Sequence, residues 1–354
     1  MSTTAIPWTD RVWNPVTGCT KVSQGCKHCY AETVAGRFFA TQYPPVRLYE
    51  LSASRDSLHE QATERPRRFT DVRTHEDRLL EPMRWWRKPG RVFVNSMSDL
   101  FHEVVPFEFI DRVFAVMALA DRQTFQVLTK RAQRMRDYLS HPDVGQRVAE
   151  LAMAQVCRGS FDSYSEDWTA EDAENYIPAW PLPNVWLGVS VEDQATADER
   201  IPLLLDTPAA VRFVSYEPAL GPVDFTELPS RYDNGDGQGE CNRPLLRLNA
   251  LKGGHWCGGC FRESAHLDWV IVGGESGPGA RPFAIEWADL TVRQCREADV
   301  AVFVKQLGAH VVSEGRSELQ NGQRVWQWRA GLRDRKGGDP AEWPEHLRVR
   351  EFPR

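Results

Sequence analysis

Short apolar runs alternate with amphipathic stretches along most of the chain. Apolar runs of strand length occupy residues 91–97, 124–130, 184–191, 211–218, 268–272 and 300–306. Between them apolar residues recur at helical spacing, which predicts helices over residues 106–121, 132–139, 195–205 and 282–298. Continuous apolar runs are typical of strands buried on both faces of a parallel sheet. The alternation therefore predicts an α/β fold with six or seven βα units joined by right-handed crossovers.

Several regions interrupt this alternation. Residues 40–90 are irregular and rich in Arg, with a short helix predicted over 71–87, and residues 144–180 hold a helix followed by an acidic, aromatic stretch. Residues 229–266 are rich in Gly, Asn and Arg, and residues 309–354 are polar with scattered Trp. We therefore predict one α/β unit built from residues 1–228 and 267–308, an insertion at 229–266 and a C-terminal extension at 309–354.

Composition narrows the class of protein. The chain has 354 residues with a net charge of −6, so no overall basic field indicates nucleic acid, and any such contact would need a local patch. No run approaches the length of a membrane span, and residues 1–10 lack the apolar core of a signal peptide. We therefore expect a cytoplasmic protein without membrane contact. Its eight cysteines are then expected to be reduced thiols or metal ligands rather than disulfides.

Three of these cysteines, Cys19, Cys26 and Cys29, lie within eleven residues. The apolar segment 12–16 precedes them and a predicted helix over residues 31–40 follows. Three thiolates on one loop can ligate three corners of a 4Fe-4S cluster and leave the fourth iron open for a small molecule. The alternative is a zinc site with His28 as the fourth ligand. His28 stands between two of the thiols, a place from which it could hardly turn toward the same metal.

Polar residues recur where the predicted strands end. In parallel α/β folds, ligands gather at the carboxyl ends of the strands. The sequence places the following residues there: Cys19, Asn95, Ser96, Thr129, Lys130, Ser190, Glu192, Glu217, Lys305 and residues 273–275. This coincidence favours one shared active face, although many of these positions are also explained by the ordinary need of a strand to end in polar residues.

A second group of metal-ligating residues lies in the insertion. Cys257 and Cys260 have the spacing of a zinc knuckle, and Cys241 with one histidine, His255 or the nearby His266, would complete a tetrahedral set. A second iron–sulfur cluster and an insertion without metal remain alternatives. A metal would explain how a segment with few large apolar side chains becomes ordered.

The segment from Gly18 to Glu32 resembles the cluster loop of radical S-adenosylmethionine (SAM) enzymes. More closely, the chain is similar to the phage Gp37/Gp68-type family of radical-SAM-like proteins. That resemblance extends to residues 92–101, 127–131, 186–192, 215–218, 272–277 and 343–350. The loop together with several strand-end motifs in the same order is fairly specific, whereas any one of them alone would be weak.

The resemblance implies a partial TIM-type (β/α)6–7 barrel, a 4Fe-4S cluster held by the three cysteines, and S-adenosyl-L-methionine as cofactor. It also implies reductive cleavage of SAM, an electron donor such as flavodoxin or ferredoxin, and modification or repair of a substrate. It places SAM contacts at Asn95, Ser96, Ser98 and Asp99. From their positions at later strand ends, Ser190 and Glu192 are further expected SAM contacts, with a solvated strand end as the alternative, and Glu275 is an expected contact to the substrate or to the ribose of SAM. For Asn95, Ser96, Ser98 and Asp99, capping of a following helix is the alternative.

The cysteine loop departs from the usual pattern at two points. Six residues separate Cys19 from Cys26, where radical SAM enzymes usually have three, and His28 replaces the usual aromatic residue before the last ligand. A longer loop can still close around one cluster, because an extended chain spans about 3.3 Å per residue.

Nucleic acid is a candidate substrate. The loop is loosely similar to that of the spore photoproduct lyase branch, and Arg residues interleave with Trp85 and Trp86 in the region 65–91. Acidic neighbours make a salt-bridged surface the alternative there. A non-catalytic metal-containing nucleic-acid-binding protein is the alternative for the whole chain.

Overall fold

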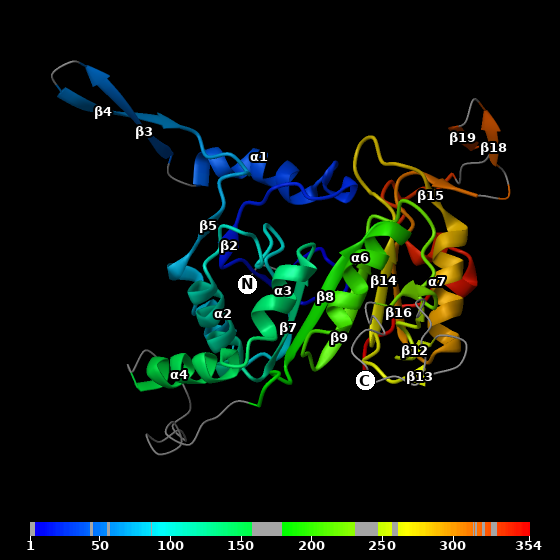
Figure 1. The fold of residues 1–354 in the computed structure, drawn as a ribbon. Coiled ribbons are helices and arrows are strands. Elements are labelled where there is room, and N and C mark those ends of the chain that lie inside the picture. Colours follow the sequence, from blue (N-terminus) through cyan, green and yellow to red (C-terminus); the bar gives the residue numbers. More distant parts are fainter. Residues whose placement is uncertain are drawn as a thin grey trace.

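The computed structural model describes residues 4–354 except 43–44, 55–56, 86, 158–178, 231–246, 257–260, 314, 316, 321–322 and 327–330. Its centre is a curled sheet of seven parallel strands that forms a half-barrel (Figure 1). The strands in spatial order are β1 (Arg11–Trp13), β6 (Gly90–Val94), β7 (Gln123–Thr129), β8 (Val185–Val191), β9 (Val211–Tyr216), β14 (Trp269–Gly273) and β16 (Ala301–Gln306). The expected α/β class and its parallel sheet are therefore confirmed.

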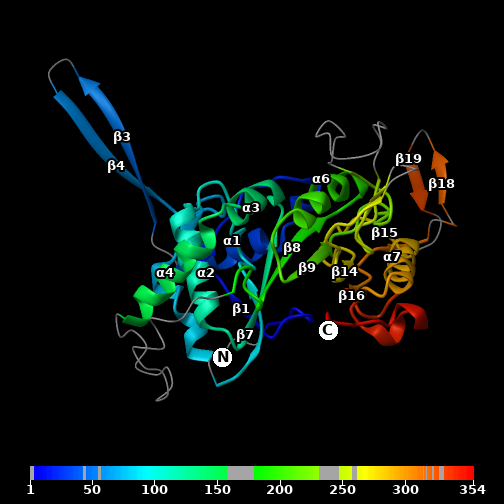
Figure 2. The ribbon, with the colours of Figure 1, turned by 60° about the horizontal axis from the view of Figure 1, so that its bottom comes forward.

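Helices cover the convex side of this sheet (Figures 1 and 2). They are α2 (Phe107–Leu119), α3 (Ala132–Leu139), α4 (Val144–Cys157), α6 (Gln194–Leu205) and α7 (Ile285–Glu297). The start of α6 shows how local sequence sets an element, because Asp193 and Thr196 form a reciprocal capping box there. The main apolar core lies between these helices and the strands.

A second, smaller core fills the inside of the curl. Trp8, Phe213, Trp269, Ile271 and Phe303 are buried together, and the ring of Trp269 contacts the other three aromatic rings. Because side chains alternate along a strand, the next inward positions toward the carboxyl ends are Ser215 and Glu217 after Phe213, and Lys305 after Phe303. The interior thus changes from an aromatic floor at the amino end to polar side chains at the carboxyl end.

Helix α1 (Tyr30–Gln42) lies across one end of the sheet, and a long hairpin projects beyond it (Figure 1). The hairpin consists of β3 (Val46–Ser54) and β4 (Ser57–Arg65), which pair antiparallel over their whole length. The sequence had indicated only irregular structure here, because Glu, Ala and Ser, common in both strands, are depleted in β-sheets.

The helix expected over residues 71–87 is wrong. The structure has two short 3-10 helices there, Glu76–Arg78 and Glu81–Trp85, after the two-residue strand β5 (Arg73–Thr74). Pro82 lies within this segment, and proline is poorly tolerated inside an α-helix because it lacks the N–H donor and its ring clashes with the preceding turn.

The region 229–266 is described in part. Four two-residue strands form a small antiparallel sheet: β10 (Leu228–Pro229), β11 (Arg247–Leu248), β12 (His255–Trp256) and β13 (Phe261–Arg262). It packs beside α6.

The C-terminal region returns to the half-barrel. Strand β15 (Phe283–Ala284) pairs with β17 (Val311–Val312), and β18 (Ser317–Gln320) pairs with β19 (Gln323–Trp326). Two 3-10 helices, Pro340–Glu342 and Glu345–Leu347, follow these strands in the chain. Arg350 then forms an antiparallel bridge with Phe303, and the Val304 N–H donates to the Val349 carbonyl at 2.9 Å. The last residues thus lie along the outer edge of β16.

Candidate functional site

The cysteine loop, residues 18–29, leaves strand β2 (Val16–Thr17) beside the end of β6. Gly18 forms a parallel bridge with Ser98, and its N–H donates to the Met97 carbonyl at 3.0 Å. Gly18 has a φ of 92°, and a Cβ there would stand 2.7 Å from the Phe69 carbonyl oxygen. Only glycine fits this conformation and approach, so the chain turns into the loop at a fixed place.

The first anchor of the loop lies at the end of β7. The Thr20 hydroxyl is 2.9 Å from Nε2 of His102 and accepts from Nη2 of Arg131 at 3.0 Å. Nη1 of the same arginine is 3.6 Å from the Cys19 sulfur. Asp99 supports this arginine, because its carboxylate accepts from Nη1 of Arg131 at 3.2 Å and from the Thr129 hydroxyl at 2.7 Å.

The second anchor is Glu192, which follows β8 and is 1% exposed. Its carboxylate accepts from the Ser23 hydroxyl at 2.9 Å and pairs with Lys130 and Arg200. Gly25 lies directly against it, since a Cβ at Gly25 would stand 2.3 Å from Oε1. A buried carboxylate with two cations around it is a rigid support, so the middle of the loop is held in place.

The third anchor is Glu275, which follows β14. It accepts from Nε and Nη2 of Arg281 and lies 3.1 Å from Nδ1 of His28. Burial raises the pKa of Glu275, but the hydrogen bonds from Arg281 and His28 outweigh burial and bring the pKa to about 2. Arg281 also donates to the Gln24 carbonyl at 3.0 Å. Since one nitrogen of His28 faces Glu275, this arrangement does not favour His28 as the fourth ligand of a zinc ion.

The three anchors show that the loop crosses the carboxyl ends of the strands from β7 over β8 to β14. Of the residues expected at this face, Glu192 and Glu275 contact the loop directly, and Asp99 supports it through Arg131. Three further contributors, Ser23, Arg131 and Arg281, were not predicted as site residues. Arg131 stands directly after Lys130 at the end of a predicted strand, and that position was the available signal.

Cys19, Cys26 and Cys29 are partly buried free thiols. Burial, with the nearby Asp99, raises the pKa of Cys19 to about 11 although Arg131 acts in the opposite direction, and burial also raises the pKa of Cys29. A bound metal would reverse this effect by stabilising the thiolates.

Within the described part of the chain, no group of three or more His, Cys, Asp or Glu side chains is arranged to hold a single metal ion. A four-iron cluster makes a different demand, because its thiolates bind different iron atoms and stand further apart than the ligands of one ion. Three partly buried thiols on one anchored loop are a donor set that such a cluster can use.

The side chains expected to contact SAM after β6 contact the chain itself. Asn95 accepts from the Val16 N–H at 3.2 Å, Ser98 donates to the Val16 carbonyl at 2.7 Å, and Ser96 donates to Asn14 at 3.2 Å. They thus position the segment that leads into the cysteine loop. The helix-capping alternative is wrong, because α2 begins only at residue 107. Contact of these residues with SAM stays a prediction.

Asn95 has two unusual features. Its φ is 61°, in the left-handed region that residues other than glycine rarely adopt, and its side chain is 3% exposed. Its amide nitrogen has no hydrogen-bond partner among the described residues. Asparagine tolerates the left-handed region better than most residues, so the buried amide donor without a partner is the feature that calls for an explanation.

Inside the mouth, two ion pairs stand above the aromatic floor. Lys305 lies 3.1 Å from Glu217, and Lys130 pairs with Glu192. Ser190, expected as a SAM contact, is 6% exposed, and its carbonyl accepts from Nη1 of Arg200 at 2.8 Å.

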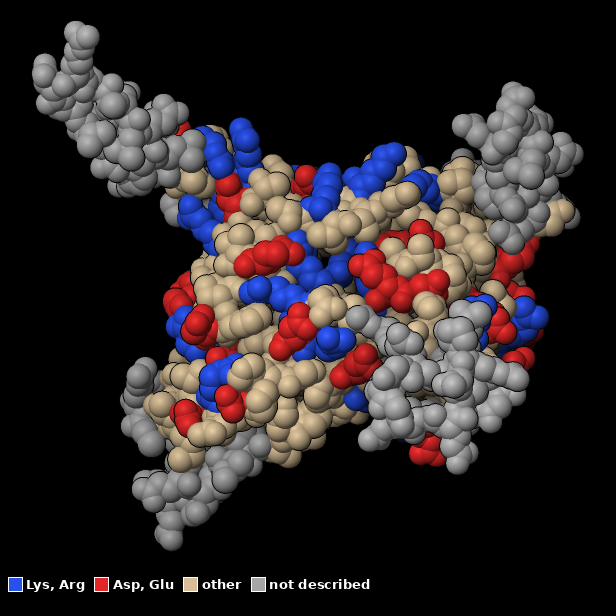
Figure 3. Space-filling model, viewed as in Figure 1, with Lys and Arg blue, Asp and Glu red and all other residues tan. Residues whose placement is uncertain are grey.

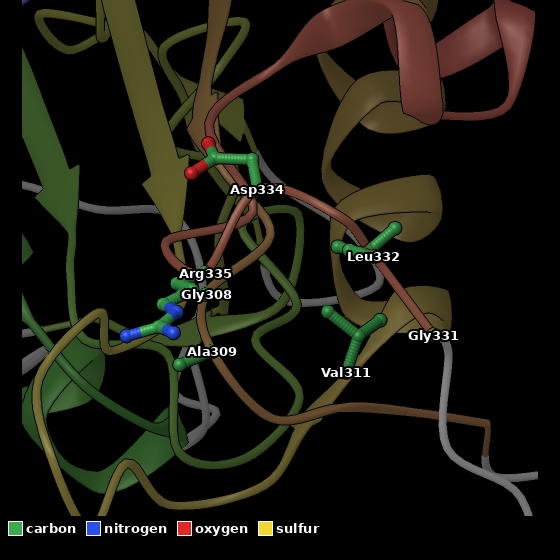
Figure 4. Close-up of a pocket in the computed structure, with 7 residues that line it drawn as sticks. All are labelled: Gly308, Ala309, Val311, Gly331, Leu332, Asp334 and Arg335. Carbon is green, nitrogen blue, oxygen red and sulfur yellow. The ribbon is translucent and has the colours of Figure 1, made fainter.

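A pocket of about 450 Å³ opens beside the end of β16 (Figure 4). Its lining residues are Gly308, Ala309, Val311, Gly331, Leu332, Asp334 and Arg335. In Figure 4, Val311 and Leu332 lie on one side while Arg335 extends away from them. The Ala309 N–H donates to the Glu275 carbonyl at 2.7 Å, so the pocket adjoins the third anchor of the cysteine loop.

The second predicted metal site cannot be assembled from the described residues. Cys241, Cys257 and Cys260 lie outside them. The fourth member, His255, is buried, and its Nδ1 is 2.7 Å from the Ser230 hydroxyl.

The Arg-rich region 65–91 is extensively paired. Arg65 makes a bidentate ion pair with Asp71 at 2.6 Å, buried Arg67 donates to the Thr17 carbonyl, and Arg91 pairs with Asp10. These contacts agree with a salt-bridged surface rather than an open basic groove.

Comparison with known proteins assigns the family. The family described as a protein of unknown function, DUF5131, matches residues 3–330. The chain belongs to this family. No curated protein and no solved structure matches the chain. In the part of this DUF5131 protein that the structure describes, no helix has the length and apolar character needed to cross a membrane.

Proposed function

We propose that this DUF5131 protein is a radical SAM enzyme, in which Cys19, Cys26 and Cys29 hold a 4Fe-4S cluster. The observation that carries the proposal is the position of the cysteine loop across the carboxyl ends of a parallel half-barrel sheet. This is the end where α/β folds bind ligands. Two strand-end carboxylates, Glu192 and Glu275, and the guanidinium of Arg131 hold the loop at this end of the half-barrel.

Each part of the mouth has a place in this proposal. The aromatic floor excludes water from the amino end of the interior, and the ion pairs of Lys130 and Lys305 offer partners for the carboxylate and amino groups of SAM. The spare amide donor of Asn95 is a further candidate contact. When reduced and loaded with SAM, such a cluster would supply one electron for cleavage of a carbon–sulfur bond, which divides SAM into methionine and the 5′-deoxyadenosyl radical.

The proposal also covers the finer architecture. It takes the half-barrel as the partial (β/α)6–7 barrel of residues 1–228 and 267–308, with 229–266 as a metal-binding insertion and 309–354 as an extension. Zinc and iron analysis of wild type and Cys257→Ala protein tests the insertion. Loss of one equivalent of metal from the variant is expected, and equal metal content would contradict it.

Anaerobic reconstitution tests the main proposal. The wild type should bind iron and sulfide, and with dithionite as reductant it should release 5′-deoxyadenosine from SAM. Cys26→Ala should bind less iron and sulfide than the wild type and release less 5′-deoxyadenosine. Cys295→Ala is the matched control, because Cys295 is a fully buried thiol on α7 and should leave both properties intact. A wild-type protein that binds a cluster but releases no 5′-deoxyadenosine would support the non-catalytic alternative.

We propose nucleic acid as the substrate class. Tyr30 is 69% exposed directly after Cys29, and Lys27 and Arg37 are exposed near it. Figure 3 shows basic side chains along the edge where α1 lies. An exposed aromatic ring among cations suits base stacking, which contributes about 1–3 kcal/mol per base.

Fluorescence anisotropy with a single-stranded oligonucleotide tests this substrate class. Affinity should fall between about 50 and 200 mM salt, and Tyr30→Ala should weaken it by about 1–3 kcal/mol. Phe107→Ala, which alters a partly exposed aromatic residue on α2, is the control. If the affinity changes neither with salt concentration nor in Tyr30→Ala, the surface around Tyr30 is not the nucleic-acid-binding site.

A further inference from the structure

Arg131 contacts the cysteine loop more extensively than any strand-end anchor expected from the sequence. The residue follows β7, its side chain is 5% exposed, and its N–H donates to the Thr129 hydroxyl at 2.9 Å. Its guanidinium therefore starts from a fixed point on the sheet and not from a mobile loop.

An arginine side chain has five N–H donors. Here Nε donates to Glu103 at 2.8 Å, and Nη1 faces both Asp99 at 3.2 Å and the Cys19 sulfur at 3.6 Å. Nη2 faces the hydroxyl and the carbonyl oxygen of Thr20 at 3.0 and 3.5 Å. Every donor thus has an acceptor, and three of the acceptors belong to the cysteine loop.

The carboxylates around Arg131 fix its direction. Asp99 accepts from the Thr129 hydroxyl and from the Lys130 N–H as well, so it joins the ends of β6 and β7 before it meets the guanidinium. A lysine would keep the positive charge but not the planar fork that reaches Asp99, Cys19 and Thr20 together. The geometry therefore requires arginine and not only a cation.

We infer that Arg131 is a positioning residue that holds Cys19 as a cluster ligand and sets the reduction potential of the cluster through its hydrogen bond to the sulfur. This inference rests on the proposed function in one respect, the presence of a cluster at the three thiols. A donor and a positive charge beside a ligating sulfur stabilise the more negatively charged, reduced state. Loss of both should therefore make the potential more negative.

The test compares Arg131→Gln and Arg131→Lys with the wild type after anaerobic reconstitution. Iron and sulfide content, the electron paramagnetic resonance spectrum and the midpoint potential are measured on each protein. We expect lower cluster content and a more negative potential in Arg131→Gln. Arg131→Lys should show a smaller shift of the potential in the same direction, because it keeps the charge and loses the fork.

Arg134→Gln is the matched control. Arg134 lies one turn further along, on α3, and donates to the Val105 carbonyl at 2.7 Å. Its loss should leave the potential unchanged. If Arg131→Gln does not fold, the midpoint potential of Arg131→Lys alone tests the inference.

The outcomes separate this inference from the proposed function. A variant at Arg131 that holds a full cluster at the wild-type potential overturns the inference. A cluster that shifts as expected but releases no 5′-deoxyadenosine from SAM supports the inference and contradicts the enzymatic proposal. A wild-type chain that takes up no iron and sulfide overturns both.

Discussion

Replacing Gly25 by alanine tests the packing of the cysteine loop directly. The added Cβ would stand 2.3 Å from Oε1 and 2.6 Å from Cγ of Glu192, whereas ordinary contacts begin at 3.4 Å. Glu192 cannot simply turn away, because it is almost fully buried and paired with Lys130 and Arg200. The loop must therefore move outward by about 1 Å and lose the hydrogen bond from Ser23.

The cost can be worked from these contacts. Overpacking of this kind costs about 1–3 kcal/mol. A loop that moves away exchanges this strain for the loss of a hydrogen bond to a charged group, which contributes a similar amount, so the net cost stays at about 1–3 kcal/mol. Because the clash is relieved by movement of the loop, most of the cost should favour local opening. A penalty of this size raises the population of the open loop about 5- to 150-fold.

Limited trypsin digestion measures that opening, since Lys21 and Lys27 flank Gly25 and are exposed. Cleavage within the loop should accelerate about 5- to 150-fold in Gly25→Ala if opening is fast relative to cleavage. Iron and sulfide uptake should fall in parallel.

Gly36→Ala on α1 is the matched control for this substitution. No atom lies within 4 Å of the Cβ position at Gly36, and alanine favours a helix over glycine by about 1 kcal/mol. This variant should be as resistant to trypsin as the wild type. If Gly25→Ala resists trypsin equally well and takes up iron normally, Gly25 does not pack against Glu192 and the second anchor is refuted.

Two further predictions concern stability. Asp71→Asn should lower the free energy of unfolding by about 1 kcal/mol at pH 7, because the ion pair with Arg65 lowers the pKa of Asp71 from 3.8 to about 2 and solvent screens part of the resulting stabilisation. The pKa of Asp71 is lower in the folded state than in the unfolded state, so this stabilisation is complete above about pH 4 and disappears between pH 4 and 2. Urea unfolding at pH 7, 5 and 3 should therefore show a smaller difference between variant and wild type only at pH 3. Gly188→Ala should destabilise the sheet by at least about 1–3 kcal/mol, because its Cβ would stand 2.5 Å from the Phe213 ring in the core, and an unchanged urea midpoint would contradict this packing.

Much of the fold follows from hydrophobic period alone. Helix α3 has the predicted limits, and the ends of β7, β8 and β16 lie within a residue of those predicted, because strands buried on both faces and amphipathic helices carry strong local signals. The carboxyl-end rule also placed Glu192 and Glu275 at the face that the cysteine loop crosses.

The failures have physical causes. The β3–β4 hairpin pairs through its backbone and has few residues typical of strands, so propensity gave no signal. Ser23, Arg131 and Arg281 act through contacts with residues far away in the chain. Ser23 and Glu192, for example, are 169 positions apart. The sequence around a charged residue at the end of a strand does not indicate which loop that residue will contact.

An open half-barrel has two edge strands, and exposed edges invite other chains to add strands and aggregate. One edge, β1, has only three residues, which offers little backbone for such addition. The other edge, β16, is covered because Arg350 pairs with Phe303 and the Glu351 N–H donates to the Val302 carbonyl at 3.0 Å. Removal of residues 349–354 should therefore leave β16 open to edge-to-edge association, so the last residues protect the solubility of the folded chain.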